Sequence, residues 1–146
     1  MRLILVRHGE TKWNHENRVV GHTGMALNSN GRKQVGLLAQ ALKDKEVSCI
    51  YSSPLKRARE TADTIASAHG LNVVTVDALK EVDAGELEGL TFNEVVERYG
   101  VFFQEWIKDT PSLKIPGGES ITDLRERTWP AVQRIVSEHP SEACLL

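Results

Sequence analysis

Cysteine is scarce in this 146-residue chain, and long apolar runs are missing. The two cysteines, Cys49 and Cys144, share no Cys-x-x-Cys spacing and read as small buried hydrophobic residues, which excludes a disulfide scaffold. No apolar run approaches the roughly 18 residues of a membrane helix, and the first strand is too short for the core of a signal peptide. We therefore expect a cytoplasmic protein that makes no membrane contact.

The chain also lacks a surplus of charge of either sign. Its formal net charge is −2 at pH 7, so the basic surface typical of nucleic-acid binding is not expected. A small anion bound locally suits this balance better than nucleic acid. A hydrophobic content of 40% fits one globular domain over residues 1–146, and the sequence does not decide whether that domain forms oligomers.

Strand and helix signals alternate along the chain, which predicts an α/β fold. We expect strands at residues 3–6, 47–51 and 73–76 in a mainly parallel sheet, with helices on both faces in a three-layer α/β/α arrangement. One helix follows residue 28, a second runs from Pro54 to Gly70, and a last one starts near Ser120. Pro130 should kink the last helix because proline cannot donate the helical hydrogen bond.

Five of the eight aromatic residues fall in a helical segment, residues 92–112. Positions 99, 102, 103 and 106 share one helical face, which favours a small subdomain that packs its own core. The alternative is a lid over the functional site.

The most informative cluster is residues 5–11, Leu-Val-Arg-His-Gly-Glu-Thr, where an apolar strand ends in a loop. Ligands bind at such strand ends in open α/β sheets. His8 could attack phosphorus if cations and N–H donors neutralise the phosphoryl oxygens. Arg7 and Asn14 offer such donors, and Gly9 allows close backbone approach.

Two further clusters also follow strands. Residues 52–62 place Arg57 at the start of a helix, where it either converges on the same anion or forms an exposed surface charge. Residues 79–89 are acidic and punctuated by glycine, so either one of their carboxylates donates a proton to a leaving group or the segment is a solvated acidic loop.

Together, residues 5–14, 52–62 and 81–89 resemble the histidine phosphatase superfamily, also called phosphoglycerate mutase-like, in order and spacing. The resemblance implies that His8 is the nucleophile that becomes phosphohistidine and that Glu81 is the general acid. It implies that Arg7, Arg57 and Asn14 bind phosphate, with Thr23 as a weaker candidate in the loop 21–23. The carbonyl of Gly9 would fix the tautomer of His8.

The resemblance implies hydrolysis of phosphomonoesters without a metal or another cofactor. The four other histidines show no metal-ligand spacing. The short region after Glu81 and the segment 116–120, Pro-Gly-Gly-Glu-Ser, look more like small phosphatases, including the α-ribazole phosphatase type and broad-specificity relatives, than like phosphoglycerate mutases. Mutase-type phosphoryl transfer remains the alternative.

The family also has a second catalytic histidine after a late strand, and residues 143–146 resemble the start of that strand. We therefore expect a C-terminally truncated domain whose last strand leaves one side of the sheet unpaired. The 146-residue chain alone should hydrolyse phosphate esters poorly. A catalytically impaired phosphate-binding module is the third interpretation.

Overall fold

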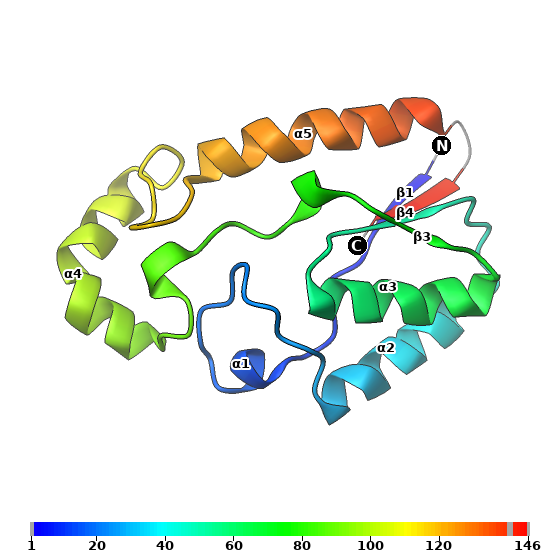
Figure 1. Cartoon of the computed structure of the whole chain (residues 1–146), viewed down its shortest axis with the longest axis horizontal. Coiled ribbons are helices and arrows are strands. Elements are labelled where there is room, and N and C mark those ends of the chain that lie inside the picture. Colours follow the sequence, from blue (N-terminus) through cyan, green and yellow to red (C-terminus); the bar gives the residue numbers. More distant parts are fainter. Residues whose placement is uncertain (1, 140–141, 146) are drawn as a thin grey trace.

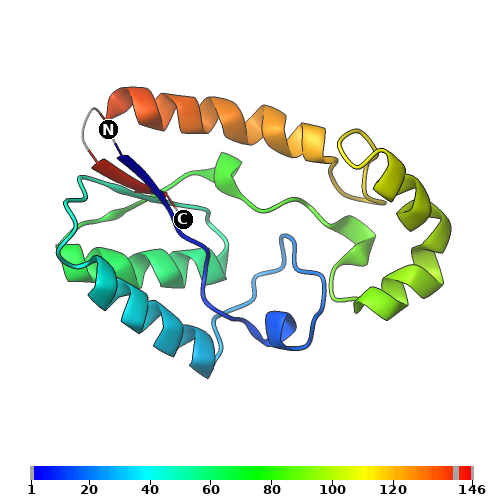
Figure 2. The same cartoon turned by 180° about the vertical axis from the view of Figure 1, so that it is seen from behind.

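The computed structural model describes residues 2–139 and the backbone of residues 142–145, and it shows a parallel sheet between two layers of helices (Figures 1 and 2). The expected three-layer α/β fold is confirmed. In chain order, the elements are β1 (Arg2–Leu5), α1 (Lys12–His15), α2 (Ser29–Leu42), β2 (Ile50–Ser52), α3 (Lys56–His69), β3 (Val73–Thr75), the 3-10 turns η1 (Asp77–Leu79) and η2 (Gly85–Leu87), α4 (Phe92–Lys108), α5 (Ile121–Glu138) and β4 (Glu142–Leu145).

The four strands lie in the order β1-β4-β2-β3, and every neighbouring pair is parallel. In this register Ile50 of β2 lies opposite Cys144 on one side and Val73 on the other. The last strand is therefore paired on both sides, and our expectation of an unpaired side there was wrong. Among the described strands, β1 and β3 form the two edges of the sheet instead.

The two faces of the sheet are covered by different helices (Figure 1). Ile50 points toward α2 and α3 and packs with Ala39 and Ile65, whereas the next residue, Tyr51, packs on the other face against Ile135 of α5. This alternation follows from the two-residue repeat of a strand. Because both faces are covered, all three residues of β2 are buried, as expected for a strand inside a parallel sheet.

Local signals explain where most helices begin and end. Asn28 caps α2 by accepting a hydrogen bond from Gly31 N at 2.7 Å, and Gly70 ends α3 in the left-handed region at φ 65°. Ser120 caps α5, as its position in the sequence predicted. The second and third strands are shorter than expected, because they begin at Ile50 and end at Thr75.

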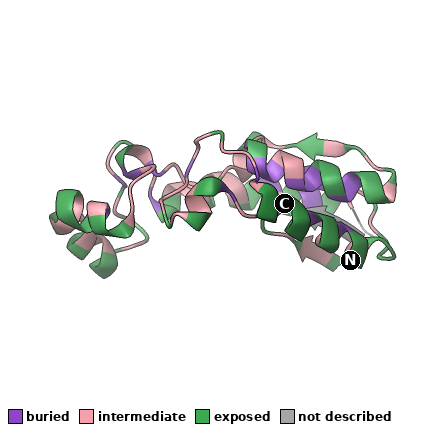
Figure 3. Cartoon of the chain, turned by 90° about the horizontal axis from the view of Figure 1, so that it is seen from below, coloured by how far each residue is buried: buried purple, intermediate pink, exposed green. Residues whose placement is uncertain are grey.

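The two long C-terminal helices differ from expectation. α4 ends at Lys108 and is broken at Tyr99 (φ −127°, ψ 26°), whereas α5 continues through Pro130 as one helix. Pro130 and Glu126 are both exposed, so water can satisfy the carbonyl that proline leaves without a donor. α4 lies at the end of the molecule away from the sheet (Figure 3). No helix in the described part of the chain is long and apolar enough to cross a membrane.

Candidate active site

The segments that follow β1, β2 and β3 converge at the carboxyl edge of the sheet. They enclose a cavity of about 240 Å³ and bring together residues of all three sequence clusters. Its lining includes no residue of α4, so this helix does not form a wall of the cavity. The lining consists of Val6, Arg7, His8, Ser53, Leu55, Arg57, Ala58, Leu79, Lys80 and Glu81.

Hydrogen bonds at both ring nitrogens hold His8 in one tautomer. Nδ1 lies 2.7 Å from the carbonyl oxygen of Gly9 and donates to it, while Nε2 accepts a hydrogen bond from Arg57 Nε at 3.1 Å. Burial lowers the pKa of His8, and the positive charges of Arg57 and Arg7 lower it further, against the opposing hydrogen bond to Gly9. The imidazole is therefore neutral near pH 7, with its lone pair on Nε2.

The loop that carries His8 is tied to α2 and α3. A Cβ at Gly9 would lie 2.6 Å from the carbonyl oxygen of Gly31, so only glycine allows this approach. The Gly9 amide donates to Thr61 Oγ1 at 3.2 Å, and the same hydroxyl donates to the Arg57 carbonyl at 2.8 Å. Thr61 thus links the first two clusters, a role that the sequence reasoning missed although residues 52–62 contain it.

Arg57 is 2% exposed, which excludes the alternative of a surface charge. Besides His8 Nε2, its guanidinium donates to the carbonyls of Gly21 at 2.9 Å and Thr23 at 3.3 Å. Burial lowers the pKa of Arg57, while the negative charges of Glu81 and Glu88 raise it. The charged fork is therefore fixed beside the ring nitrogen that holds the lone pair.

Thr23 contributes to this arrangement through its backbone. Its hydroxyl and its amide both donate to the carboxylate of Glu88, and the amide of His22 does the same. Glu88 therefore holds the loop 21–23 in place, and the carbonyls of this loop accept hydrogen bonds from Arg57. Glu88 belongs to the third sequence cluster, but we had assigned it no role.

Asn14 and Arg7 line a second, adjacent cavity together with His8, Glu10 and Gln34. The side-chain oxygen of Asn14 accepts hydrogen bonds from Thr11 N at 3.0 Å and Thr11 Oγ1 at 2.8 Å and so completes a capping box at α1. With this oxygen engaged, the amide NH₂ of Asn14 is the group that could donate to an anion.

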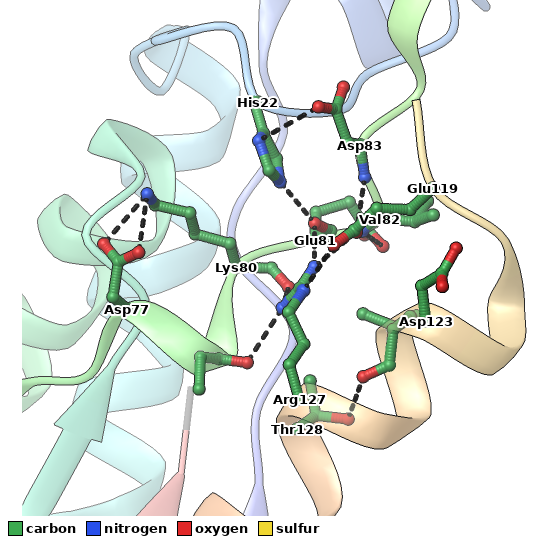
Figure 4. A network of polar contacts seen from close by, with 12 residues as sticks. His22, Asp77, Lys80, Glu81, Val82, Asp83, Glu119, Asp123, Arg127 and Thr128 are labelled. Atoms are coloured by element: carbon green, nitrogen blue, oxygen red, sulfur yellow. Dashed lines mark hydrogen bonds and ion pairs between the residues drawn. The ribbon is translucent and has the colours of Figure 1, made fainter. Parts of the chain in front are cut away.

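Glu81 lies on the rim of the main cavity, and its main chain is firmly held (Figure 4). Its carbonyl accepts hydrogen bonds from His22 Nε2 at 2.8 Å and Arg127 Nη2 at 2.7 Å. Its side-chain Oε1 accepts a bond from Val82 N at 2.9 Å. The negative charge of Glu81 raises the pKa of both His8 and Arg57, in opposition to the effect of burial.

Sequence reasoning missed Arg127 and Glu119. Arg127 forms a two-point ion pair with Glu119, with both N–O distances at 2.8 Å. The segment 116–120 around Glu119 was noticed only as a family feature, and Arg127 on an amphipathic helix could not be told from a solvated surface charge. A signal for Glu119 was therefore present, whereas none existed for Arg127.

Comparisons with known proteins identify the family of this chain. The family model for the histidine phosphatase superfamily (branch 1) matches residues 3–146. Phosphoserine phosphatase 1 of Hydrogenobacter thermophilus is 37% identical over 139 residues, which cover 95% of this chain and 66% of that protein. Phosphoglycerate mutase-like protein 4 of Arabidopsis thaliana is 39% identical over 143 residues, which cover 96% of this chain and 62% of that protein.

A solved structure shows the same fold. The putative α-ribazole-5′-phosphate phosphatase of Escherichia coli K-12 superposes with a TM-score of 0.91 at 26% identity, over 99% of this chain and 72% of that one. The chain spans less than two thirds of the length of the two curated relatives above. The resemblance inferred from three sequence clusters is confirmed, and the chain belongs to the histidine phosphatase superfamily, branch 1.

Proposed function

We propose that the protein hydrolyses phosphomonoesters, without a metal, through a phosphohistidine at His8. One observation carries this proposal: the neutral His8 ring presents the Nε2 lone pair 3.1 Å from the buried guanidinium of Arg57. A phosphoryl group that approaches Nε2 would have its oxygens beside that guanidinium, with Arg7 on the same cavity wall. Fixed positive charge of this kind stabilises the charge on the transferring group.

In the first step, Arg57 Nε exchanges its hydrogen bond to Nε2 for one to a phosphoryl oxygen, and the freed Nε2 lone pair forms the N–P bond while the P–O bond to the leaving group breaks. The leaving oxygen takes the electron pair of that bond and receives a proton from the Glu81 carboxyl group. Glu81 lies on the rim of the same cavity as His8, where a leaving group can reach it.

In the second step, water attacks the phosphorus of phosphohistidine. The Glu81 carboxylate takes the proton from water, the N–P bond breaks, and its electron pair returns to Nε2 of His8. Gly9 keeps its hydrogen bond to Nδ1 throughout, so the ring does not need to change tautomer. Arg7 and Arg57 bind the phosphoryl oxygens in both steps, and Asn14 adds a neutral donor from the adjacent cavity.

We expect the substrate to be a small phosphorylated metabolite, because a relative that shares most of this chain is a phosphoserine phosphatase. A mutase would use the same first step but would return the phosphoryl group to a second hydroxyl of the substrate. Because one relative is described as phosphoglycerate mutase-like, the mutase reaction is the second candidate function. The acceptor of the phosphoryl group distinguishes the two reactions: water in hydrolysis, and a hydroxyl of the substrate in a mutase.

The test is a panel of phosphomonoesters given to the full-length protein, with inorganic phosphate and isomerised substrate measured together. We expect phosphate release that His8→Ala abolishes. Isomerised product without phosphate would favour the mutase. Tight binding of inorganic phosphate with neither product would favour a phosphate-binding module.

A further inference from the structure

Arg127 of α5 is the most completely bonded side chain near the site. A guanidinium has five N–H donors. Here Nε and one Nη2 bond go to the carboxylate of Glu119, while the other three bonds go to the carbonyls of Ala78 and Lys80 at 2.8 Å and of Glu81 at 2.7 Å. No donor is left for a substrate, so Arg127 acts on the protein itself.

The three carbonyls belong to the segment 78–81, which leads from the turn η1 to the cavity. Glu81 lies in no helix or strand, so no regular hydrogen-bond ladder fixes its backbone. In place of such a ladder, Arg127 donates one hydrogen bond to each of the three carbonyls. The Glu81 carbonyl also accepts a hydrogen bond from His22 Nε2 at 2.8 Å (Figure 4). The backbone of Glu81 is thus held from α5 on one side and from the loop 21–23 on the other.

Glu119 orients Arg127 and anchors the next part of the loop. Its two carboxylate oxygens match the two donors of the guanidinium fork, a geometry that lysine cannot reproduce. Glu119 also accepts a hydrogen bond from Asp83 N at 3.0 Å. The paired hydrogen bonds raise the pKa of Arg127 and lower the pKa of Glu119, so both groups stay charged at neutral pH.

We infer that Arg127, oriented by Glu119, is the positioning residue that fixes the backbone of Glu81 so that its carboxyl group stays within reach of the leaving group. This inference rests on the proposed function, in which Glu81 is the acid. Proton donation matters most when the leaving oxygen is strongly basic. Loss of Arg127 should therefore slow poor leaving groups selectively and leave phosphate binding intact.

The experiment compares an alkyl phosphate with an aryl phosphate whose phenol is acidic, in Arg127→Gln and Glu81→Gln of the full-length protein. We expect kcat for the alkyl ester to fall about tenfold or more beyond any fall for the aryl ester in both variants. Arg127→Lys should restore little, because an ammonium group cannot reach three carbonyls and a carboxylate at once. Arg134→Gln is the matched control on the same helix, where an exposed arginine pairs with Glu138.

Hydrogen exchange of residues 78–83 provides a second readout that does not depend on turnover. Arg127→Gln should speed exchange in this segment, and Arg134→Gln should not. Unchanged exchange of residues 78–83 in Arg127→Gln would overturn the inference. So would an equal loss of kcat for both esters in Arg127→Gln, if Glu81→Gln slows the alkyl ester selectively. If exchange rises but Glu81→Gln does not discriminate, Arg127 still holds the segment, and the assignment of Glu81 as the acid has failed instead.

Discussion

Among the single residues of the site, Arg57 places a full positive charge where the fold shields it from water. Three acceptors hold its guanidinium: His8 Nε2 and the carbonyls of Gly21 and Thr23. This arrangement disfavours a second positive charge on the neighbouring imidazole. Arg57 therefore both prepares an anion site and keeps His8 in its nucleophilic form.

The charge state of His8 gives a direct prediction. Burial, Arg57 and Arg7 lower its pKa, so the titration midpoint of His8 should lie below the ordinary histidine value of about 6.5 in NMR spectra of the free protein. Arg57→Met should move this midpoint upward, because one charge and one donor to Nε2 are lost. Arg59→Met, two residues further along α3 and paired with Asp63, should leave it unchanged.

The same shift has a defined sign for stability. The pKa of His8 is lower in the folded state than in the unfolded chain, so the unfolded state binds more protons as the pH falls. His8 therefore contributes stability above its unfolded pKa, and this contribution is lost as the pH falls toward its folded pKa. A folded-state midpoint above that of an unfolded peptide would contradict this electrostatic account.

The sequence identified some of these residues and not others for a physical reason. His8, Gly9 and Arg7 stand together after an apolar strand, so local pattern alone marks them as an anion site. Arg57 stayed ambiguous because burial is a tertiary property, and its neighbours on the helix include exposed charges. Arg127 acts through carbonyls almost fifty residues away in the chain, and main-chain carbonyls leave no signature in a sequence.

At the scale of elements, the site depends on how closely α2 approaches the loop after β1. Gly31 in the first turn of α2 packs directly against the backbone of Glu10, where a Cβ would overlap the carbonyl oxygen. Gly9 makes the reciprocal contact with the Gly31 carbonyl. Two glycines thus allow two backbones to touch, and this contact helps to orient His8.

Two substitutions in α2 test this contact. Gly31→Ala should destabilise the fold by about 1–3 kcal/mol, because its new methyl group meets backbone that cannot move aside easily. Gly36→Ala in the same helix has open space around its Cβ and should stabilise the fold by about 0.5–1 kcal/mol. Urea unfolding measures both. Equal effects of the two substitutions would contradict a packing role for Gly31.

The elements were predictable where local chemistry decides them. Asn28, Gly70 and Ser120 mark helix ends in the sequence and in the structure. The break of α4 at Tyr99 was not predictable, because Tyr99 keeps its contacts with the cluster of Leu87, Val95 and Ile115 despite its non-helical backbone. Phe102 and Phe103 pack against the same cluster, to which Val19, Val82 and Leu90 from outside the helix also belong, so α4 packs on the neighbouring loops rather than only on itself.

At the scale of the whole molecule, a chain with a net charge of −2 concentrates positive charge at one edge of its sheet. Parallel strands make this possible, because their carboxyl ends all face the same way. Clusters far apart in the sequence therefore meet at one cavity, with β4 between β1 and β2. Strand order was beyond the reach of the sequence, since no local signal says that the last strand inserts between the first two in the chain.

Trapping of the phosphorylated protein tests the central claim most directly. The full-length protein is mixed briefly with a substrate labelled in the phosphoryl group, denatured in alkali and digested for mass spectrometry. We predict an acid-labile phosphoryl group on His8 that appears and decays fast enough to account for turnover, and no labelling in His8→Gln. Labelling of another residue, or turnover that survives in His8→Gln, would contradict the account.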